Sequence, residues 1–148
     1  MIYGFLILAA LLLDQGTKWW AETWLSQRST FPVIPDVFHL TYCRNTGAAF
    51  SILRNKQILL VLVTSGVMVV LGLWLIRLVQ KGGPVSLKLS LALILAGGVG
   101  NLIDRVRLNY VIDFLDFRLI HFAVFNVADS LIVIGTLLLA WHVLFRKG

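Results

Sequence analysis

The chain has 148 residues, of which 59% are hydrophobic and 14% are charged, and its mean hydropathy is +0.89. A soluble domain carries about 25% charged residues, so this composition excludes an ordinary soluble domain and indicates one membrane domain over residues 1–148. The formal net charge of +6 predicts contact with anionic lipid, or serves only to set the topology. Nucleic acid is not an expected partner, because we find no basic patch with interleaved aromatic residues apart from tryptophans typical of a membrane interface.

The distribution of apolar residues predicts an all-α membrane protein with four transmembrane helices, at about 2–24, 57–79, 87–105 and 126–145. A bilayer core needs roughly 20 helical residues to cross. The run from Ile58 to Ile76 is uncharged throughout and is the clearest span. Each of the other three reaches spanning length only if its acidic residue, Asp14, Asp104 or Asp129, lies at the membrane boundary.

The two ends of the first span carry different signals. Met1–Leu13 is not expected to be a cleaved signal peptide, since it lacks a basic start and a small-residue cleavage site. After the span, residues 28–55 contain two short segments of strand-like composition and an Asn45-Thr46-Gly47 turn signal. We therefore expect a small β element on the membrane surface between the first and second helices.

With four spans, every acidic residue falls on one membrane face, and these residues are Asp14, Glu22, Asp36, Asp104, Asp113, Asp116 and Asp129. The opposite face holds both termini and the short, basic connection around Val79–Ser86, which is typical of a cytoplasmic loop. More basic residues nevertheless lie on the acidic face, so counting positive charges alone does not orient the chain.

Two Asn-x-x-Asp pairs, Asn101 with Asp104 and Asn126 with Asp129, place an amide beside a carboxylate on one helical face. An asparagine in this position can hold a carboxylate in a fixed orientation. Helix-end capping is the alternative interpretation, because both residue types are favoured caps. The convergence of both pairs on the same membrane face favours a functional site.

Three further acids have distinct surroundings. Asp14 precedes Lys18 by four residues, which predicts a helical ion pair that is either structural or part of a site. Asp104 is followed by Arg105, its expected cationic partner. Asp113 lies between apolar neighbours, and desolvation without a partner raises a carboxyl pKa. We expect Asp113 and Asp129 to share a proton and to activate water, unless Asp113 is only a surface acid in a loop.

Other chemistries have little support. The three histidines are scattered, so we expect no metal site and no cofactor. Cys43 stands alone, which excludes an intrachain disulfide and favours a small buried residue over a catalytic thiol. A proton-coupled carrier would need carboxylates near mid-membrane and access from both sides. A structural subunit that binds a partner helix would leave the two Asn-x-x-Asp pairs unexplained.

Five short motifs follow one another along nearly the whole chain: Asp14–Lys18, Arg44–Ser51, Gly97–Arg105, Val111–Phe114 and Phe125–Ser130. In this order they resemble the lipoprotein signal peptidases, also called signal peptidase II, which are membrane aspartic peptidases of bacteria. The resemblance implies a catalytic dyad of Asp113 and Asp129. It also implies a site lined by Asp14, Asn45, Asn101, Arg105 and Asn126. To these residues we add Lys18, the expected partner of Asp14, and Asp104, the expected partner of Arg105.

The resemblance further implies a substrate, an inhibitor and a location. The substrate would be a prolipoprotein whose cysteine already carries a diacylglyceryl group, cleaved just before that cysteine. The cyclic peptide globomycin would inhibit the enzyme. The chain would lie in the bacterial inner membrane as a monomer in contact with lipid, with its site near the extracytoplasmic face.

Overall fold

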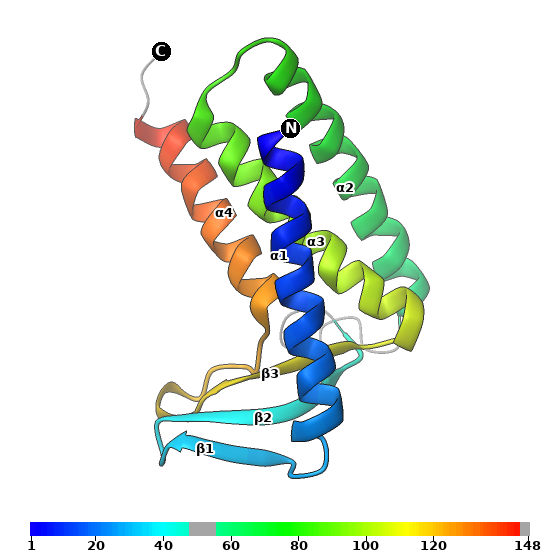
Figure 1. Ribbon diagram of the computed structural model, residues 1–148, viewed down its shortest axis with the longest axis vertical. Coiled ribbons are helices and arrows are strands. Elements are labelled where there is room, and N and C mark those ends of the chain that lie inside the picture. The colour runs from blue at the N-terminus through cyan, green and yellow to red at the C-terminus, as the bar shows by residue number, and fades with distance from the viewer. Residues whose placement is uncertain (48–55, 146–148) are drawn as a thin grey trace.

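The computed structural model describes residues 1–47 and 56–145. It contains four long helices, which are α1 (Ile2–Trp20), α2 (Gln57–Gln80), α3 (Val85–Leu108) and α4 (Val127–Phe145). A π-helical turn, η1 (Ala21–Leu25), extends α1, and a short 3-10 turn, η3 (Arg118–Ile120), precedes α4. The strands are β1 (Thr30–Ile34), β2 (Phe38–Asn45) and β3 (Val111–Phe117). Figure 1 shows the helices as a bundle with the sheet across one end.

The helices turn large apolar side chains outward, as a bilayer requires. On α2, for example, Ile58, Leu62 and Val69 are all strongly exposed. Three helices, α2, α3 and α4, are long and apolar enough to cross a membrane, which supports a multi-pass membrane protein. α1, which carries Asp14 and Lys18, is not among these three, so the fourth span remains a prediction.

The helix ends follow from local chemistry. α3 runs past the predicted end at residue 105 and ends at Leu108, where Asn109 adopts a left-handed conformation with φ of 63°. Asparagine tolerates this conformation better than most residues, so it is a suitable C-terminal cap. α1 and η1 together cover the whole of the first predicted span. Parts of two predictions, residues 48–55 of the outer segment and the basic tail at 146–148, lie outside the described residues.

α3 is the central helix and packs against all three of the others. Gly97 allows the close approach of α4, because a Cβ atom at this position would collide with the backbone carbonyl of Ala128. Small residues at helix contacts commonly serve this purpose in membrane proteins, where apolar burial alone gives little preference for helix association. The tight contact fixes the start of α4 relative to the polar end of α3.

The sheet has the order β1-β2-β3, with both pairs antiparallel. We expected strands only between the first two helices, and β3 corrects this expectation: the connection after α3 supplies the third strand. Ile112 and Phe114 on β3 pack against Ala21 and Leu25 of η1, in a small apolar core beneath the sheet. This tertiary packing stabilises β3 as a strand. In the register of the sheet, Asp113 lies opposite Cys43 of β2.

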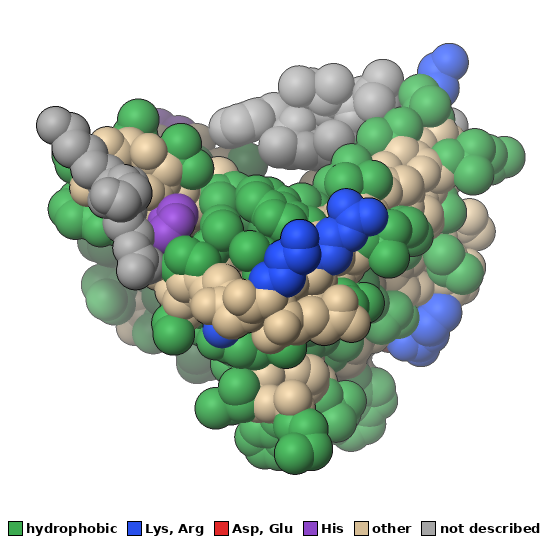
Figure 2. Space-filling view, turned by 90° about the horizontal axis from the view of Figure 1, so that it is seen from above, with side chains coloured by type: hydrophobic (Ala, Val, Ile, Leu, Met, Phe, Trp, Pro, Cys, Tyr) green, Lys and Arg blue, Asp and Glu red, His purple; other side chains and the backbone are tan. Residues whose placement is uncertain are grey.

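The two ends of the bundle differ in charge. α1 begins and α4 ends at the end opposite the sheet (Figure 1). Seen from that end, the surface shows Lys, Arg and His side chains among apolar ones, and no acidic side chain is visible on it (Figure 2). By contrast, Asp113 and Asp116 lie on β3, and Asp104 accepts a hydrogen bond from the backbone N–H of Ile112 on the same strand.

Candidate active site

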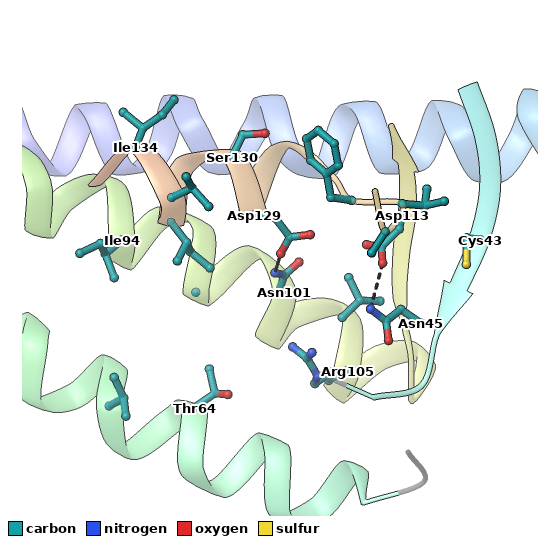
Figure 3. A pocket seen from close by; sticks show the side chains of 18 of the residues that line it. Cys43, Asn45, Thr64, Ile94, Asn101, Arg105, Asp113, Asp129, Ser130 and Ile134 are labelled. Atoms are coloured by element: carbon teal, nitrogen blue, oxygen red, sulfur yellow. Dashed lines mark hydrogen bonds between the residues drawn. The ribbon is translucent and has the colours of Figure 1, made fainter. Parts of the chain in front are cut away.

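Two carboxylates meet at the polar end of a cavity of about 910 Å³. Asp113 lies on β3 and is almost fully buried, whereas Asp129 lies in the first turn of α4 and is partly exposed. Figure 3 shows the two side chains reaching the cavity from these different elements, with Arg105 of α3 nearby. Residues from distant parts of the chain therefore form one site.

Asn126 connects the two acids. Its backbone N–H donates to Asp129 Oδ2 over 3.2 Å, and Asp129 N–H donates to Asn126 Oδ1 over 2.9 Å. This reciprocal pair is a capping box, and it holds the start of α4 in place. The side-chain amide of Asn126 also donates to Asp113 Oδ1 over 2.7 Å. One buried asparagine therefore caps a helix and orients both carboxylates.

Two further asparagines complete the contacts of the carboxylates. Asn101 Nδ2 donates to Asp129 Oδ1 over 2.8 Å, and Asn45 Nδ2 donates to Asp113 Oδ2 over 3.0 Å (Figure 3). Each acid thus accepts a hydrogen bond on both oxygens. Within the part of the chain that the structure describes, neither Asp113 nor Asp129 forms an ion pair with a Lys, Arg or His.

The surroundings of Asp113 raise its pKa from 3.8 to about 7. Burial is the largest cause, and the charge of Asp129 is the second; the hydrogen bonds from Asn45 and Asn126 oppose both. Desolvation and a nearby like charge each disfavour the ionised carboxylate. Asp113 can therefore keep a proton near neutral pH, and carboxyl groups with such shifted pKa values are frequent in active sites.

A buried ionic cluster lies behind the carboxylates. Lys18 Nζ is 3.0 Å from Asp14 Oδ2, 3.1 Å from Asp104 Oδ2 and 2.9 Å from Asn101 Oδ1. Asp14 also accepts from the backbone N–H of Ala128 over 2.9 Å. Because the ammonium group can only donate, it holds the oxygen of Asn101 and leaves the Asn101 amide nitrogen directed at Asp129. The cluster thus joins α1, α3 and α4 directly behind the site.

Arg105 places a cation beside the carboxylates without pairing with them. Its Nη2 donates to the carbonyl oxygen of Gly47 over 3.1 Å. Its Nε is buried and has no hydrogen-bond partner among the described residues. The guanidinium group lines the cavity (Figure 3). The part of the guanidinium group that lines the cavity can therefore donate to a bound carbonyl oxygen.

Away from the carboxylates, the cavity becomes apolar. Val63, Val67 and Met68 of α2 face Ile94 of α3 and Ile132 of α4 across it. Among the described residues, no group of three or more His, Cys, Asp and Glu side chains could hold a metal ion. The arrangement can therefore bring a pair of carboxylates to an apolar ligand that carries a polar, reactive centre.

Comparison with known proteins assigns the chain to a family. The sequence profile described as "Signal peptidase (SPase) II" matches residues 6–145. The chain belongs to the signal peptidase II family. It is 48% identical to a lipoprotein signal peptidase of Caldanaerobacter subterraneus subsp. tengcongensis over 139 residues, which are 93% of this chain and 92% of that protein. It is 44% identical to the lipoprotein signal peptidase of Clostridioides difficile over 148 residues, covering 100% and 98% of the two chains.

Solved structures agree with this assignment. Two structures of a bacterial membrane enzyme, determined by the in meso method, match this signal peptidase II family member with TM-scores of 0.84 and 0.82. Both are 29% identical in sequence and cover 99% of this chain, and the chain covers 94% and 92% of theirs. The helical bundle with its terminal sheet is therefore a fold already observed in a membrane enzyme.

In this family member, the structure brings all nine predicted site residues together, although several contacts differ from expectation. The Asp14–Lys18 ion pair is present. Asp104, however, pairs with Lys18 and not with its sequence neighbour Arg105, whose guanidinium group is directed at the cavity. Asn101 likewise binds Asp129 on another helix and not Asp104. Adjacent helical residues point in different directions, so these partners could not be identified from sequence proximity.

Gln15 is a polar member of the cluster that sequence reasoning missed. Its amide donates to Asp104 Oδ1 over 3.1 Å and to the carbonyl oxygen of Gly100 over 3.2 Å, and so links α1 to α3. The one available signal was its position between Asp14 and Lys18 in the first motif.

Proposed function

We propose that this chain is a membrane-embedded aspartic endopeptidase that removes the signal peptide from diacylglyceryl-modified bacterial prolipoproteins, cutting just before the lipidated cysteine. The observation that carries this proposal is the pair Asp113 and Asp129 at the mouth of an apolar cavity, with the pKa of Asp113 raised to about 7. Membership of the signal peptidase II family supports the same reaction.

The chemistry follows from the different surroundings of the two acids. Asp129 accepts a proton from a water molecule held between the carboxyl groups, and the resulting hydroxide forms a bond to the carbonyl carbon of the scissile peptide. Asp113, which holds a proton near neutral pH, donates it to the leaving nitrogen as the C–N bond breaks. One proton is taken up and one is released, so the dyad carries one proton at the end as at the start.

The substrate reaches this dyad from the lipid. The acyl chains enter the apolar part of the cavity and the peptide lies along the polar end, where water is available. The Arg105 guanidinium group, which lines the cavity, donates to a backbone carbonyl of the peptide, and the sheet supports the peptide from outside. Asn45, Asn101 and Asn126 hold the carboxylates, and the Asp14–Lys18–Asp104 cluster holds the helices.

The same arrangement gives an orientation. We place the sheet and the dyad at the extracytoplasmic face of the bacterial inner membrane, with four spans and both ends of the chain in the cytoplasm. The short, basic connection between α2 and α3 is typical of a cytoplasmic loop and supports this orientation together with family membership, although more basic residues in total lie at the sheet end. The working unit is a monomer, because both carboxylates come from one chain.

The test is cleavage of a synthetic diacylglyceryl-modified prolipoprotein peptide by the purified protein in detergent. We expect one cut, immediately before the lipidated cysteine, which globomycin blocks and EDTA leaves intact. The matched peptide without the diacylglyceryl group should remain uncut. Loss of cleavage in EDTA with recovery on adding zinc would contradict an aspartic mechanism, and equal cleavage of both peptides would contradict the substrate assignment.

A further inference from the structure

One face of α3 forms the wall of the cavity along its length. Ile94, Gly98, Asn101 and Arg105 follow one another at intervals of three and four residues, and all four line the cavity. Asn101 and Arg105 are at the polar end with the dyad. Gly98 lies one helical turn further from the sheet, about 4.5 Å along the axis from Asn101. The ligand's first apolar segment therefore lies against Gly98.

Gly98 has a different neighbour from the other glycines of this helix. A Cβ atom at Gly98 would collide with the end of the Met68 side chain, its nearest neighbours being Sδ and Cε. At Gly97 the obstacle is the backbone of Ala128, and at Gly100 it is the carboxylate of Asp14. Displacing the backbone or a fully paired carboxylate costs a large free energy. The end of a methionine side chain moves at a small cost, because this unbranched side chain has three rotatable bonds.

The Met68 side chain can move toward the cavity but not toward the apolar cluster behind it. It is half-buried and packs on the apolar cluster around Leu75, Leu91 and Leu95 on one side, while it lines the cavity on the other. Packed side chains of the cluster resist an inward shift, since protein interiors are close to crystal density. The thioether therefore moves into or out of the cavity, where it forms an adjustable wall opposite α4.

The apolar lining of the cavity around Met68 determines which part of the substrate can bind there. Around Met68 the lining is Val63, Val67, Ile94 and Ile132, with the hydroxyl of Thr64 as a lone polar side chain among these neighbours. An extended peptide placed here would leave backbone N–H and C=O groups without partners, at a cost of several kcal/mol each. A hydrocarbon chain has no such groups. The cavity is continuous with the dyad, so this chain belongs to the lipid part of the substrate.

We propose that Met68, seated over Gly98, determines which acyl chains the enzyme accepts, by setting the width of the cavity one turn below the dyad. This inference rests on the proposed function and adds a specificity determinant to it. Gly98 leaves room for the methionine end to withdraw, and a side chain at position 98 would push that end into the space of the acyl chain.

The test compares diacylglyceryl peptides that differ only in the width of the acyl chains near the ester, straight dipalmitoyl against dipalmitoyl with a methyl branch next to each ester, with the full-length protein in detergent. Gly98→Ala should raise KM for the branched peptide by roughly tenfold, the discrimination typical of one misfitting apolar group, and should raise KM for the straight-chain peptide much less. Adding Met68→Ala to Gly98→Ala should restore the KM of the branched peptide. Val69→Ala, on the exposed outer face of α2 beside Met68, is the matched control and should change neither substrate.

A second variant, Met68→Phe, tests the proposal independently in case Gly98→Ala misfolds. Met68→Phe fills the cavity from α2 without altering α3, so it should reproduce the discrimination of Gly98→Ala against the branched chain. Equal losses for both peptides, or a double variant that melts normally yet is not rescued, would overturn the proposal. Wild-type protein that cleaves neither peptide would instead overturn the proposed function, a result distinguishable from cleavage by the variants without discrimination between the two acyl chains.

Discussion

Asp113 is a buried acid whose environment favours the neutral form. It faces Asp129 and accepts hydrogen bonds from two amides, and no cation pairs with it among the described residues. Its pKa of about 7 results mainly from burial. The amide donors, which oppose this shift, fix the geometry of the carboxyl group while leaving it able to hold a proton.

The raised pKa of Asp113 predicts a pH dependence of activity. We expect kcat/KM to fall as the pH rises through about 7, because the dyad then loses its shared proton and has no acid for the leaving nitrogen. Initial rates with a lipidated peptide at several pH values measure this. A rate that stays constant from pH about 6 to about 9 would contradict Asp113 as the proton donor.

The same shift predicts a pH dependence of stability. Asp113 binds its proton more tightly in the folded protein than in the unfolded chain, so the free energy of unfolding decreases as the pH rises from 3.8 to about 7. Asp113→Asn should lack this part of the decrease. Melting temperatures of both proteins across this range measure it, and parallel curves would contradict the assignment.

Lys18 is the one cation in a cluster with two buried carboxylates. We expect Lys18→Met to reduce the free energy of unfolding by about 3–5 kcal/mol, because Asp14 and Asp104 would remain buried without a counter-charge. Thr17→Val is the control in the same helical turn, since its hydroxyl bonds only to the backbone of α1. Thermal melting of the purified variants measures the difference, and similar melting temperatures would contradict a structural role for the ion pair.

At the scale of the elements, the contact of α1 with α3 depends on the absence of a side chain at Gly100. A Cβ atom there would collide with the Asp14 carboxylate, which Lys18 and the Ala128 N–H hold in place. We expect Gly100→Ala to destabilise the protein by about 1–3 kcal/mol, the usual cost of overpacking. Gly66→Ala in α2, where nothing lies within 4 Å, should be neutral or stabilising. A Gly100→Ala protein that melts like Gly66→Ala would contradict the packing account.

The elements differ in how well their sequences predict them. α2 contains the uncharged run Ile58–Ile76, and α4 has no Asp, Glu, Lys or Arg after Asp129, so composition alone predicts both helices. β3 was missed because its sequence, with acids at 113 and 116 among apolar residues, has no regular alternation. Its strand conformation depends on pairing with β2 and on packing against η1, and neither contact is local in sequence.

For the site, the sequence predicts which residues take part but not which residues bind one another. The sequence motifs predicted which residues gather, and the structure brings these residues together. The partners could not be predicted, because they depend on which way each helix turns: Asn101 faces Asp129, and Lys18 replaces Arg105 beside Asp104. The gap between α2, α3 and α4 that forms the cavity is likewise a property of tertiary packing.

At the scale of the whole molecule, family membership and the short, basic connection between α2 and α3 predict the topology. We expect both termini in the cytoplasm and the sheet outside, because this connection, which is typical of a cytoplasmic loop, lies at the end opposite the sheet (Figure 1). Reporter fusions at Gly148 and within the β1–β2 segment should therefore report opposite compartments. A periplasmic Gly148 would contradict the orientation.

A series of carboxylate-to-amide variants tests whether Asp113 and Asp129 form the catalytic dyad. Cleavage of the lipidated peptide, the melting temperature and membrane insertion are recorded for Asp113→Asn, Asp129→Asn and Asp104→Asn. We expect the first two variants to insert and fold but to lose cleavage, because an amide can neither share the proton nor accept one from water. Asp104→Asn should melt earlier and keep measurable turnover. Near-normal cleavage by Asp113→Asn, together with a folded but inactive Asp104→Asn, would contradict the account.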